Sequence, residues 1–385
     1  MSQLKYKQEV LAPVHRLVIK VGSAVLSDTE GLRLDVIDDL ARQIDAIVRT
    51  GREVVLVTSG AIAAGRIRLG RHVATIAERQ AAAAIGQIEL MRQWAKAFDA
   101  RGRSIAQLLL THQDLAERKR RLNAVHTIQA LISAGIVPIV NENDTVAVEE
   151  IRMGDNDVLS SLVAGMVQAG LLLILSDVEG VLTGDPRKRP DARLIPLITD
   201  AAAGMRGLVA ESAGPLGSGG MATKLKAARQ ATQAGISVII APGRTRNAIA
   251  SALDPACEVG TLILAARTRF GSRKHWIAFA LRPAGTLALD RGAADALRKR
   301  GRSLLASGIR DVGGEFASGD CVALLDHDGV EFGRGLVNYP AADVLKVKGR
   351  RSEDIAHLLG YKVADEIVHR DNFVLLEELA AQTRQ

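Results

Sequence analysis

A loop near the middle of the chain, residues 140–157, concentrates acidic and amide side chains. Its sequence, VNENDTVAVEEIRMGDND, contains a single base, Arg152, and is flanked by apolar segments. Carboxylate and amide oxygens of this kind can hold Mg²⁺ or accept hydrogen bonds from an ammonium group. One residue of the closing Asp-Asn-Asp triplet, 155–157, can instead cap the helix that follows. Capping does not account for Asn141 to Asp144 as well, so the loop is a candidate binding site.

Two lysines stand beside glycine-rich turns. Lys20 ends an apolar segment and Gly22 follows it, while Lys224 stands in the first turn of a predicted helix, after the stretch GPLGSGGMA at 214–222. A lysine beside exposed backbone N–H groups can bind phosphate. The alternatives are a lysine that reaches solvent at the sheet edge and a plain surface loop. The chain has no GxxxxGK[ST] motif, and the glycine stretch lacks the strand and the acid of a dinucleotide site.

The first 265 residues alternate short apolar runs with helix-like segments. The runs occupy 15–22, 53–60, 104–110, 135–140, 171–177 and 237–243. This alternation predicts an α/β fold with a mainly parallel sheet covered by helices on both faces. Ligands of such sheets bind beyond the carboxyl ends of the strands. We therefore expect Lys20, Ser59, the 140–157 loop and the pair Ser176-Asp177 to meet in one crevice.

The pattern of predicted secondary structure changes after about Arg282. Short β-like pieces punctuated by glycine, with a helix or two, predict a small β-rich domain. We place the first domain at 1–270, a linker at 271–282, the second domain at 283–366 and a C-terminal tail at 367–385. Residues 1–282 carry 36 Lys/Arg against 27 Asp/Glu, whereas residues 283–366 carry 12 against 13. The positive field therefore belongs to the first part, and it suits anionic ligands.

The composition excludes several classes of protein. The chain has 385 residues, 48% hydrophobic and 24% charged, which is typical of a soluble globular protein. No apolar run is long enough to span a membrane, and the first residues have no signal-peptide core. The two cysteines, Cys257 and Cys321, have no CxxC partner, so neither a disulfide framework nor a cysteine metal site is predicted. We expect a cytoplasmic enzyme.

Together these features favour phosphoryl transfer. Two lysines and two glycine-rich turns can neutralise phosphate charge, and the acidic loop can organise Mg²⁺ or recognise a cationic group. Such chemistry depends on positioning and charge stabilisation more than on a covalent nucleophile. The spacing of these residues indicates a phosphotransferase but does not identify its acceptor.

Six motifs taken in order resemble the glutamate 5-kinase family of the amino acid kinase superfamily. They are VIKVGSAVL, VTSGAIAAGR, VNENDTVAVEE, GDND, SDVEGVLTGDPR and GSGGMATKL, within residues 15–283. The segments DRGAADAL, GGEFASGD and LGYKVADEIVHRD resemble the PUA domain that follows many bacterial members. The resemblance implies the amino acid kinase fold, followed by a PUA domain. It also implies transfer of phosphate from ATP, with Mg²⁺, to L-glutamate as the first step of proline synthesis.

The resemblance also implies roles for individual residues. Catalytic roles fall to Lys20, Lys224, Asp155 and Asp157, the two acids organising the lysines and the magnesium. Glutamate is expected to contact Ser59, Asp144 and Asn156. The nucleotide is expected beside Lys20, Ser176, Asp177, Ser218, Gly219, Gly220, Met221, Ala222, Thr223 and Lys224. We assign no residue as a direct metal ligand, and expect nucleotide phosphates and water to hold Mg²⁺.

Partners follow from the same resemblance. We expect inhibition by proline, assembly into a homo-oligomer, and delivery of the product to a glutamate 5-phosphate reductase. The nearest alternative is a kinase of the same superfamily that acts on aspartate, carbamate or uridylate, although the NEND and GDND motifs favour glutamate. The second domain could instead serve assembly or regulation.

RNA binding by the second domain is the alternative from another class. Basic clusters at 298–302 and 346–351 could touch phosphates. The domain has a net charge of −1 and few aromatic residues, which is not typical of a nucleic-acid-binding domain. We therefore expect no tight RNA binding and no membrane association.

Overall fold

The structure is a computed structural model, and it describes residues 3–70, 73–146, 156–186, 189–204, 220–266 and 272–376. The chain divides into two compact units, Met1–Arg269 and Phe270–Gln385. Each unit has its own sheet and its own hydrophobic core. Within the described ranges, no helix has the length and apolar character needed to cross a bilayer. Both cysteines are free.

The first unit is built on an eight-stranded sheet. In spatial order its strands are β3 (Ile105–Leu110), β4 (Val137–Glu142), β2 (Glu53–Val57), β1 (Arg16–Val21), β5 (Leu171–Ser176), β7 (Ser237–Pro242), β8 (Thr261–Ile263) and β6 (Leu197–Ile198). All neighbouring pairs are parallel except β7 with β8. All six apolar runs form strands, which confirms the prediction of a mainly parallel α/β sheet.

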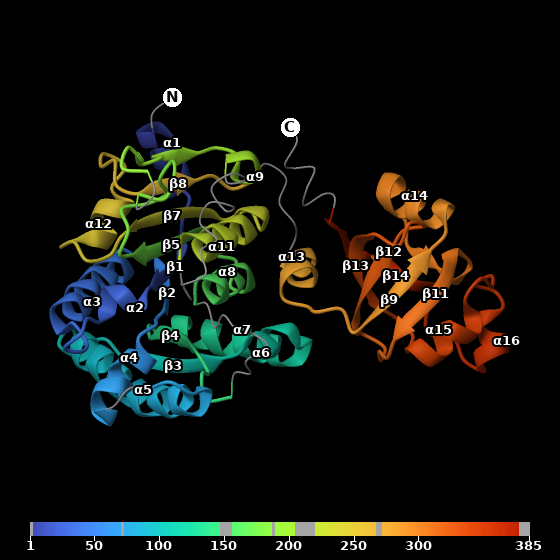
Figure 1. Cartoon of the computed structure of the whole chain (residues 1–385), viewed down its shortest axis with the longest axis horizontal. Helices are drawn as coiled ribbons and strands as arrows, with labels where there is room; N and C mark the ends of the chain where they lie inside the picture. The colour runs from blue at the N-terminus through green and yellow to red at the C-terminus, as the bar shows by residue number, and fades with distance from the viewer. Residues whose placement is uncertain are drawn as a thin grey trace. The chain divides into compact units, whose positions relative to one another are not determined.

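Helices cover both faces of this sheet (Figure 1). One face carries α2 (Ser23–Leu26), α3 (Leu34–Arg49), α4 (Ala61–Leu69), α5 (Ile76–Asp99) and α12 (Ala248–Leu253). The other carries α7 (Arg118–Ser133), α8 (Asn156–Met166) and α11 (Met221–Gln233). Three further helices are α1 (Gln3–Leu11), α6 (His112–Ala116) and α9 (Ala201–Gly204). The core between the layers is mainly aliphatic, with Trp94 and Phe98 buried on α5.

Two glycines set a very close crossing of α4 and α5. A Cβ on Gly65 would lie 1.8 Å from the carbonyl oxygen of Ala82, and one on Gly86 would lie 1.8 Å from that of Ala61. Any larger residue would force the two helices apart. This crossing holds α5 against the segment that follows β2, so it matters for the site described below.

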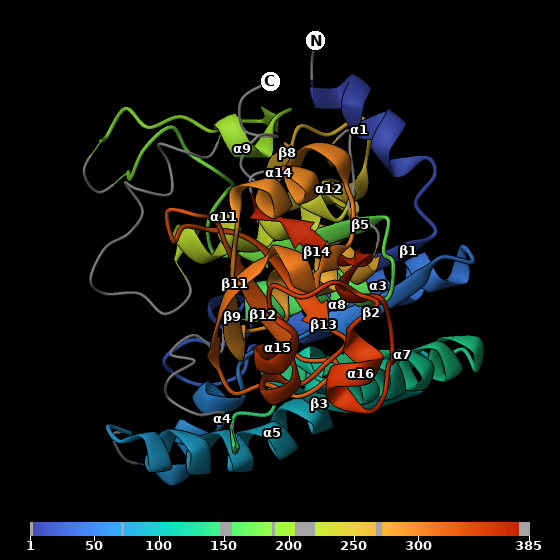
Figure 2. The same cartoon turned by 90° about the vertical axis from the view of Figure 1, so that its right-hand side faces the viewer.

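The second unit is a six-stranded sheet with short helices, and Figure 2 shows it from a second direction. The strand order is β10 (Leu304–Leu305), β14 (Glu366–Leu375), β13 (Glu331–Val337), β12 (Cys321–Leu325), β9 (Gly285–Leu289) and β11 (Ile309–Gly314). Around it lie α13 (Ser272–Phe279), α14 (Arg291–Arg300), η1 (Ala306–Gly308), α15 (Ala341–Val347) and α16 (Ile355–Leu359). This confirms the predicted small β-rich domain.

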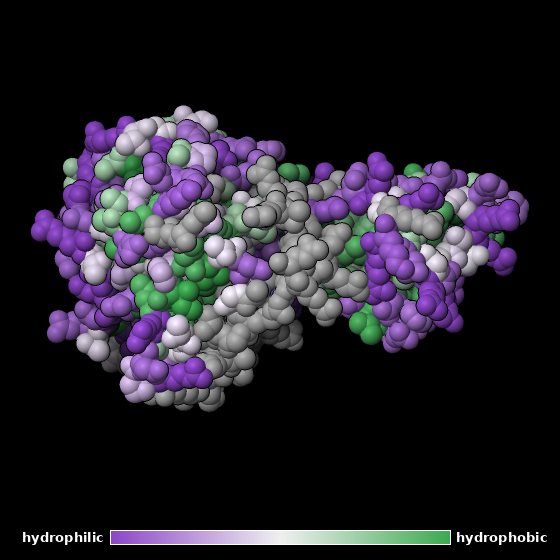
Figure 3. Space-filling view, turned by 90° about the horizontal axis from the view of Figure 1, so that it is seen from above, coloured by the Kyte–Doolittle hydropathy of each residue, from purple (hydrophilic) through white to green (hydrophobic). Residues whose placement is uncertain are grey.

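The structure differs from the sequence-based boundaries at both ends of this unit. The sequence predicts a linker at 271–282, whereas the structure forms α13 there, and Arg334 Nη1 donates to the carbonyls of Ala278 and Leu281 at 3.4 Å. The sequence predicts a tail from residue 367, but β14 runs to Leu375 and pairs with both β13 and β10. Hydrophilic residues cover most of the visible surface of each unit (Figure 3).

Candidate active site

A buried carboxylate between two lysines forms the centre of the site. Asp157, in the first turn of α8, is fully buried, and Lys20 on β1 and Lys224 on α11 are each 5% exposed. Lys20 Nζ contacts Asp157 Oδ1, and Lys224 Nζ donates to Asp157 Oδ2 at 3.2 Å. Three elements far apart in the chain thus place two positive charges and one negative charge in a single buried cluster.

The charge of this cluster is set by the lysines. Burial alone would raise the pKa of Asp157, but the attraction of Lys20 and Lys224 outweighs it and holds that pKa below its ordinary value. The carboxylate is therefore ionised at neutral pH. With both lysines protonated the cluster carries one net positive charge, which favours an approaching phosphate.

Backbone geometry beside the lysines leaves room for such a group. A Cβ at Gly22 would lie 3.6 Å from Lys20 Nζ, so glycine keeps the backbone open next to the amine. Gly220 is the extended N-cap of α11, and no atom of the described residues beyond its chain neighbours lies within 4 Å of where its Cβ would be. Thr223 Oγ1 lies 2.7 Å from the Gly220 carbonyl and 3.2 Å from Asp157 Oδ2. The first turn of α11 is thus tied to the Asp157 cluster.

A chain of hydrogen bonds runs from β2 to α5. Asn156 Nδ2 donates to Ser59 Oγ at 2.9 Å and to Asn141 Oδ1 at 3.1 Å, and Asn141 Nδ2 donates to Gln87 Oε1 at 2.7 Å. No residue that the structure describes donates to the buried Asn156 Oδ1. Because Asn156 adjoins Asp157, this polar network lies next to the lysine cluster.

Asp144 lies at the edge of a cavity of about 310 Å³ beside this network. The cavity is lined by α5, β3 and the end of β4, including Gln87, Leu109 and Glu142. Burial raises the pKa of Asp144, and the positive charge of Arg79 lowers it by less. A half-buried carboxylate with little local compensation is suited to a cationic ligand.

Ser176 and Asp177 end β5, the strand next to β1. Ser176 is buried and donates from Oγ to Asp177 Oδ1 at 3.0 Å, while Asp177 is exposed. Met221 and Ala222 begin α11 and are half-buried. Asp155, Ser218 and Gly219 lie outside the described residues.

The structure thus brings together Lys20, Lys224, Asp157, Asn156 and Ser59. The parallel-sheet argument anticipates this for Lys20, Ser59 and the 140–157 loop, whereas Lys224 comes from the glycine-rich segment. Sequence reasoning missed Gln87, because a glutamine inside an alanine-rich helix has no distinguishing signal. No cluster of three acidic or histidine ligands converges on the lysines among the residues that the structure describes.

Both units of the chain are similar to known proteins. Residues 15–242 match the amino acid kinase family, and residues 285–359 match the PUA domain. Glutamate 5-kinase of Pelobacter propionicus is 46% identical over 96% of this chain and 100% of that protein. Glutamate 5-kinase of Thermus thermophilus is 48% identical over 94% of this chain and 98% of that protein. Carbamate kinase of Giardia lamblia bound to AMP-PNP aligns with a TM-score of 0.48 and 21% identity, covering 66% of this chain and 99% of that chain.

The extent of these matches, over nearly the whole chain and both of its units, shows that the chain belongs to the glutamate 5-kinase family of amino acid kinases, with a PUA domain.

Proposed function

We propose that this enzyme transfers the γ-phosphoryl group of ATP to the side-chain carboxylate of L-glutamate, forming L-glutamate 5-phosphate as the first step of proline synthesis. The observation that carries the proposal is the Lys20–Asp157–Lys224 cluster beside the Ser59–Asn156 pair. The lysines suit the phosphoryl group in transfer, and the polar network suits the amino acid acceptor. Family membership supports both the reaction and the substrate.

The reaction needs no covalent intermediate with the protein. A carboxylate oxygen of glutamate attacks the γ-phosphorus, the bond to the β–γ bridging oxygen breaks, and ADP leaves. Negative charge on the transferring oxygens is stabilised by the Lys20 and Lys224 amines, which Asp157 holds in place. Mg²⁺ bound with ATP would neutralise further phosphate charge.

The polar network supports a specific orientation of glutamate. Both amide hydrogens of Asn156 are taken by Ser59 and Asn141, so its Oδ1 acts as an acceptor. Together with Asp144 it suits the substrate ammonium group. The Ser59 hydroxyl accepts from Asn156 and so keeps its own hydrogen for a substrate carboxylate.

Changing Asp144 to asparagine is expected to weaken glutamate binding without lowering the stability of the enzyme. Loss of the negative charge is expected to raise the KM for glutamate by about tenfold or more, with a smaller change in kcat. Because burial raises the pKa of this carboxyl in the folded state, its ionisation costs stability once the pH rises through that pKa. D144N should therefore be as stable as the parent enzyme at neutral pH, or more so. Steady-state kinetics and urea unfolding measure the two effects.

The control is D99N, which removes an exposed carboxylate at the end of α5. It should leave the KM unchanged. An unchanged KM in D144N would remove Asp144 from glutamate recognition.

The substrate is tested with a panel of acceptors. The purified enzyme is incubated with Mg-ATP and hydroxylamine, which traps acyl phosphates, and with glutamate, aspartate or no acceptor. UMP and carbamate are assayed beside them by ADP release. The proposal predicts hydroxamate with glutamate only. Equal or greater turnover of another acceptor would assign the chain a different substrate within the family fold.

We further propose feedback inhibition by proline, which would compete in the glutamate region, assembly into a homo-oligomer, and consumption of the labile product by a reductase. A rate unaffected by proline well above the glutamate concentration would contradict the proposed inhibition.

The basic residues of the second unit have acidic partners. Arg298 pairs with Asp326, Lys346 with Asp343 and Lys348 with Asp311. Because these bases have local acidic partners, we propose that this unit does not bind RNA tightly; salt-sensitive, submicromolar binding of a structured RNA would overturn this.

A further inference from the structure

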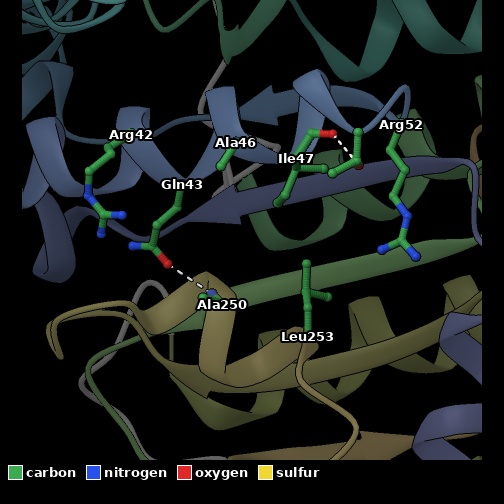
Figure 4. Close-up of a pocket in the computed structure, with 8 residues that line it drawn as sticks. Arg42, Gln43, Ala46, Ile47, Arg52, Ala250 and Leu253 are labelled. Carbon is green, nitrogen blue, oxygen red and sulfur yellow. Dashed lines mark hydrogen bonds between the residues drawn. The ribbon is translucent and has the colours of Figure 1, made fainter.

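A groove on the outer face of the first unit lies between α3 and α12 and encloses about 530 Å³. Figure 4 shows Arg42 at one end and Arg52 at the other, with Ala46, Ile47 and Leu253 between them. Gln43 Oε1 accepts a hydrogen bond from the Ala250 backbone N–H at 2.8 Å, which ties the two helices together along the groove. A space of this volume with an apolar centre and polar ends is typical of small-molecule sites.

The groove is separate from the Lys20–Asp157–Lys224 cluster. Arg52 immediately precedes β2, whereas Ser59 of the candidate active site follows it. The two residues therefore lie at opposite ends of the same strand. A ligand in the groove would not occupy the crevice at the carboxyl ends of the strands.

Arg52 differs from the neighbouring arginines in its surroundings. Arginines around α3 pair with carboxylates: Arg16 with Glu53, Arg42 with Asp39, Arg49 and Arg103 with Asp45, and Arg101 with Asp38. Arg52 is half-buried, and it has no hydrogen bond or ion pair with any residue that the structure describes. None of the described residues that line the groove is Asp or Glu. A half-buried guanidinium usually has an acidic partner that offsets the cost of burying its positive charge, and Arg52 has none among the described residues.

Arg42 adds to the positive character of the groove. Its Nη2 donates to Asp39 at 2.5 Å and to Asn247 at 2.6 Å. A guanidinium has five N–H donors, so this leaves others for a ligand. Both ends of the groove can therefore offer donors to an anion, while the middle is apolar.

We propose that the α3–α12 groove binds a small organic anion, with Arg52 holding a carboxylate or phosphate group and Ile47 and Leu253 contacting its hydrocarbon body. Guanidinium groups bind carboxylate and phosphate through paired hydrogen bonds. The apolar centre distinguishes an organic anion from an inorganic one.

The test uses 4-(trifluoromethyl)benzoate as probe and ¹⁹F NMR as readout, with the full-length protein saturated with AMP-PNP and glutamate so that the active site is occupied. Arg52→Gln removes the cation, and Ala46→Phe fills the groove from an exposed position on α3. Arg310→Gln is the matched control, since it removes an exposed arginine of the second unit that also has no partner among the described residues. Circular dichroism checks that each variant is folded.

Saturable binding, weakened at least about tenfold by R52Q and by A46F but not by R310Q, is the expected result. Two competitors define the chemical class: inorganic phosphate tests charge alone, and 4-(trifluoromethyl)benzyl alcohol tests the apolar body alone. The proposal is overturned if the probe does not bind saturably or if all variants bind it equally. The proposal would also be overturned if the alcohol displaced the probe as effectively as non-fluorinated benzoate does, because the groove would then be an apolar cavity only.

Discussion

Replacing Lys224 with alanine is expected to lower kcat by about 10²–10³-fold, the cost of removing one preorganised donor to a developing negative charge. Lys224 is 5% exposed and is held by Asp157, so its amine needs little reorganisation during the reaction. Lys20 is placed in the same way on the other carboxylate oxygen, so Lys20→Ala should cause a loss of similar size. The KM for glutamate should change much less, because the interaction strengthens in the transition state.

Lys226 offers a matched control on the same helix. It stands two residues further along α11, and its side chain is exposed. Lys226→Ala should retain nearly full activity in the hydroxamate assay. If K226A and K224A lose activity equally, or if neither does, the cluster is not the site of phosphoryl transfer.

Replacing Asp157 with asparagine is expected to destabilise the first unit by about 3–5 kcal/mol at neutral pH, the usual effect of removing one partner of a buried charge cluster. The variant would keep Lys20 and Lys224 buried near each other without the negative charge of Asp157 between them. Urea unfolding measures the loss. The chain has two tryptophans, so a Trp276→Phe background lets the buried Trp94 report on the first unit alone.

The pH dependence of this effect has a definite sign. The pKa of Asp157 is lowered in the folded state, so its ionisation contributes stability above the unfolded pKa, and this contribution is lost as the pH falls through the folded pKa. The difference in the free energy of unfolding between the parent enzyme and D157N should therefore become smaller at acidic pH. Removing one lysine as well, in D157N/K224M, should recover part of the lost stability.

The exposed Asp35, which pairs with Arg33 at 3.3 Å, provides the control for these measurements. Asp35→Asn should change the free energy of unfolding by no more than about 0.5 kcal/mol. A loss in D157N no larger than in D35N would show that Asp157 does not compensate the two lysines.

The sequence predicts the sheet and the centre of the site for one physical reason. Strands buried on both faces are continuous apolar runs, and the polar residue that ends such a run must lie at the sheet edge. Lys20 and Ser176 lie in the carboxyl-terminal parts of β1 and β5, and Ser59 follows β2. These three strands are parallel neighbours, so the topology places the three residues at the same end of the sheet. The Asp157 contacts with both lysines are those that the proposed organising role requires.

Features that depend on packing between distant elements could not be predicted. Gln87 reaches Asn141 only because Gly65 and Gly86 allow α4 and α5 to cross closely, and nothing in the alanine-rich helix indicates this. Strand β14 contains the polar stretch HRDN in its middle, so its sequence lacks the continuous apolar run that predicts a strand. The α3–α12 groove likewise depends on how two helices pack side by side on one face of the sheet.

We propose that the Lys20–Asp157–Lys224 cluster directs phosphate to the side-chain carboxylate of glutamate. This is tested by trapping the product with hydroxylamine, starting from L-glutamate labelled with ¹³C at position 5, and locating the hydroxamate by NMR. We expect the hydroxamate at the labelled carbon in the parent enzyme and in K226A, and a yield lower by about 10² or more in K224A. A hydroxamate at position 1, or none from a folded enzyme that binds ATP, would contradict it.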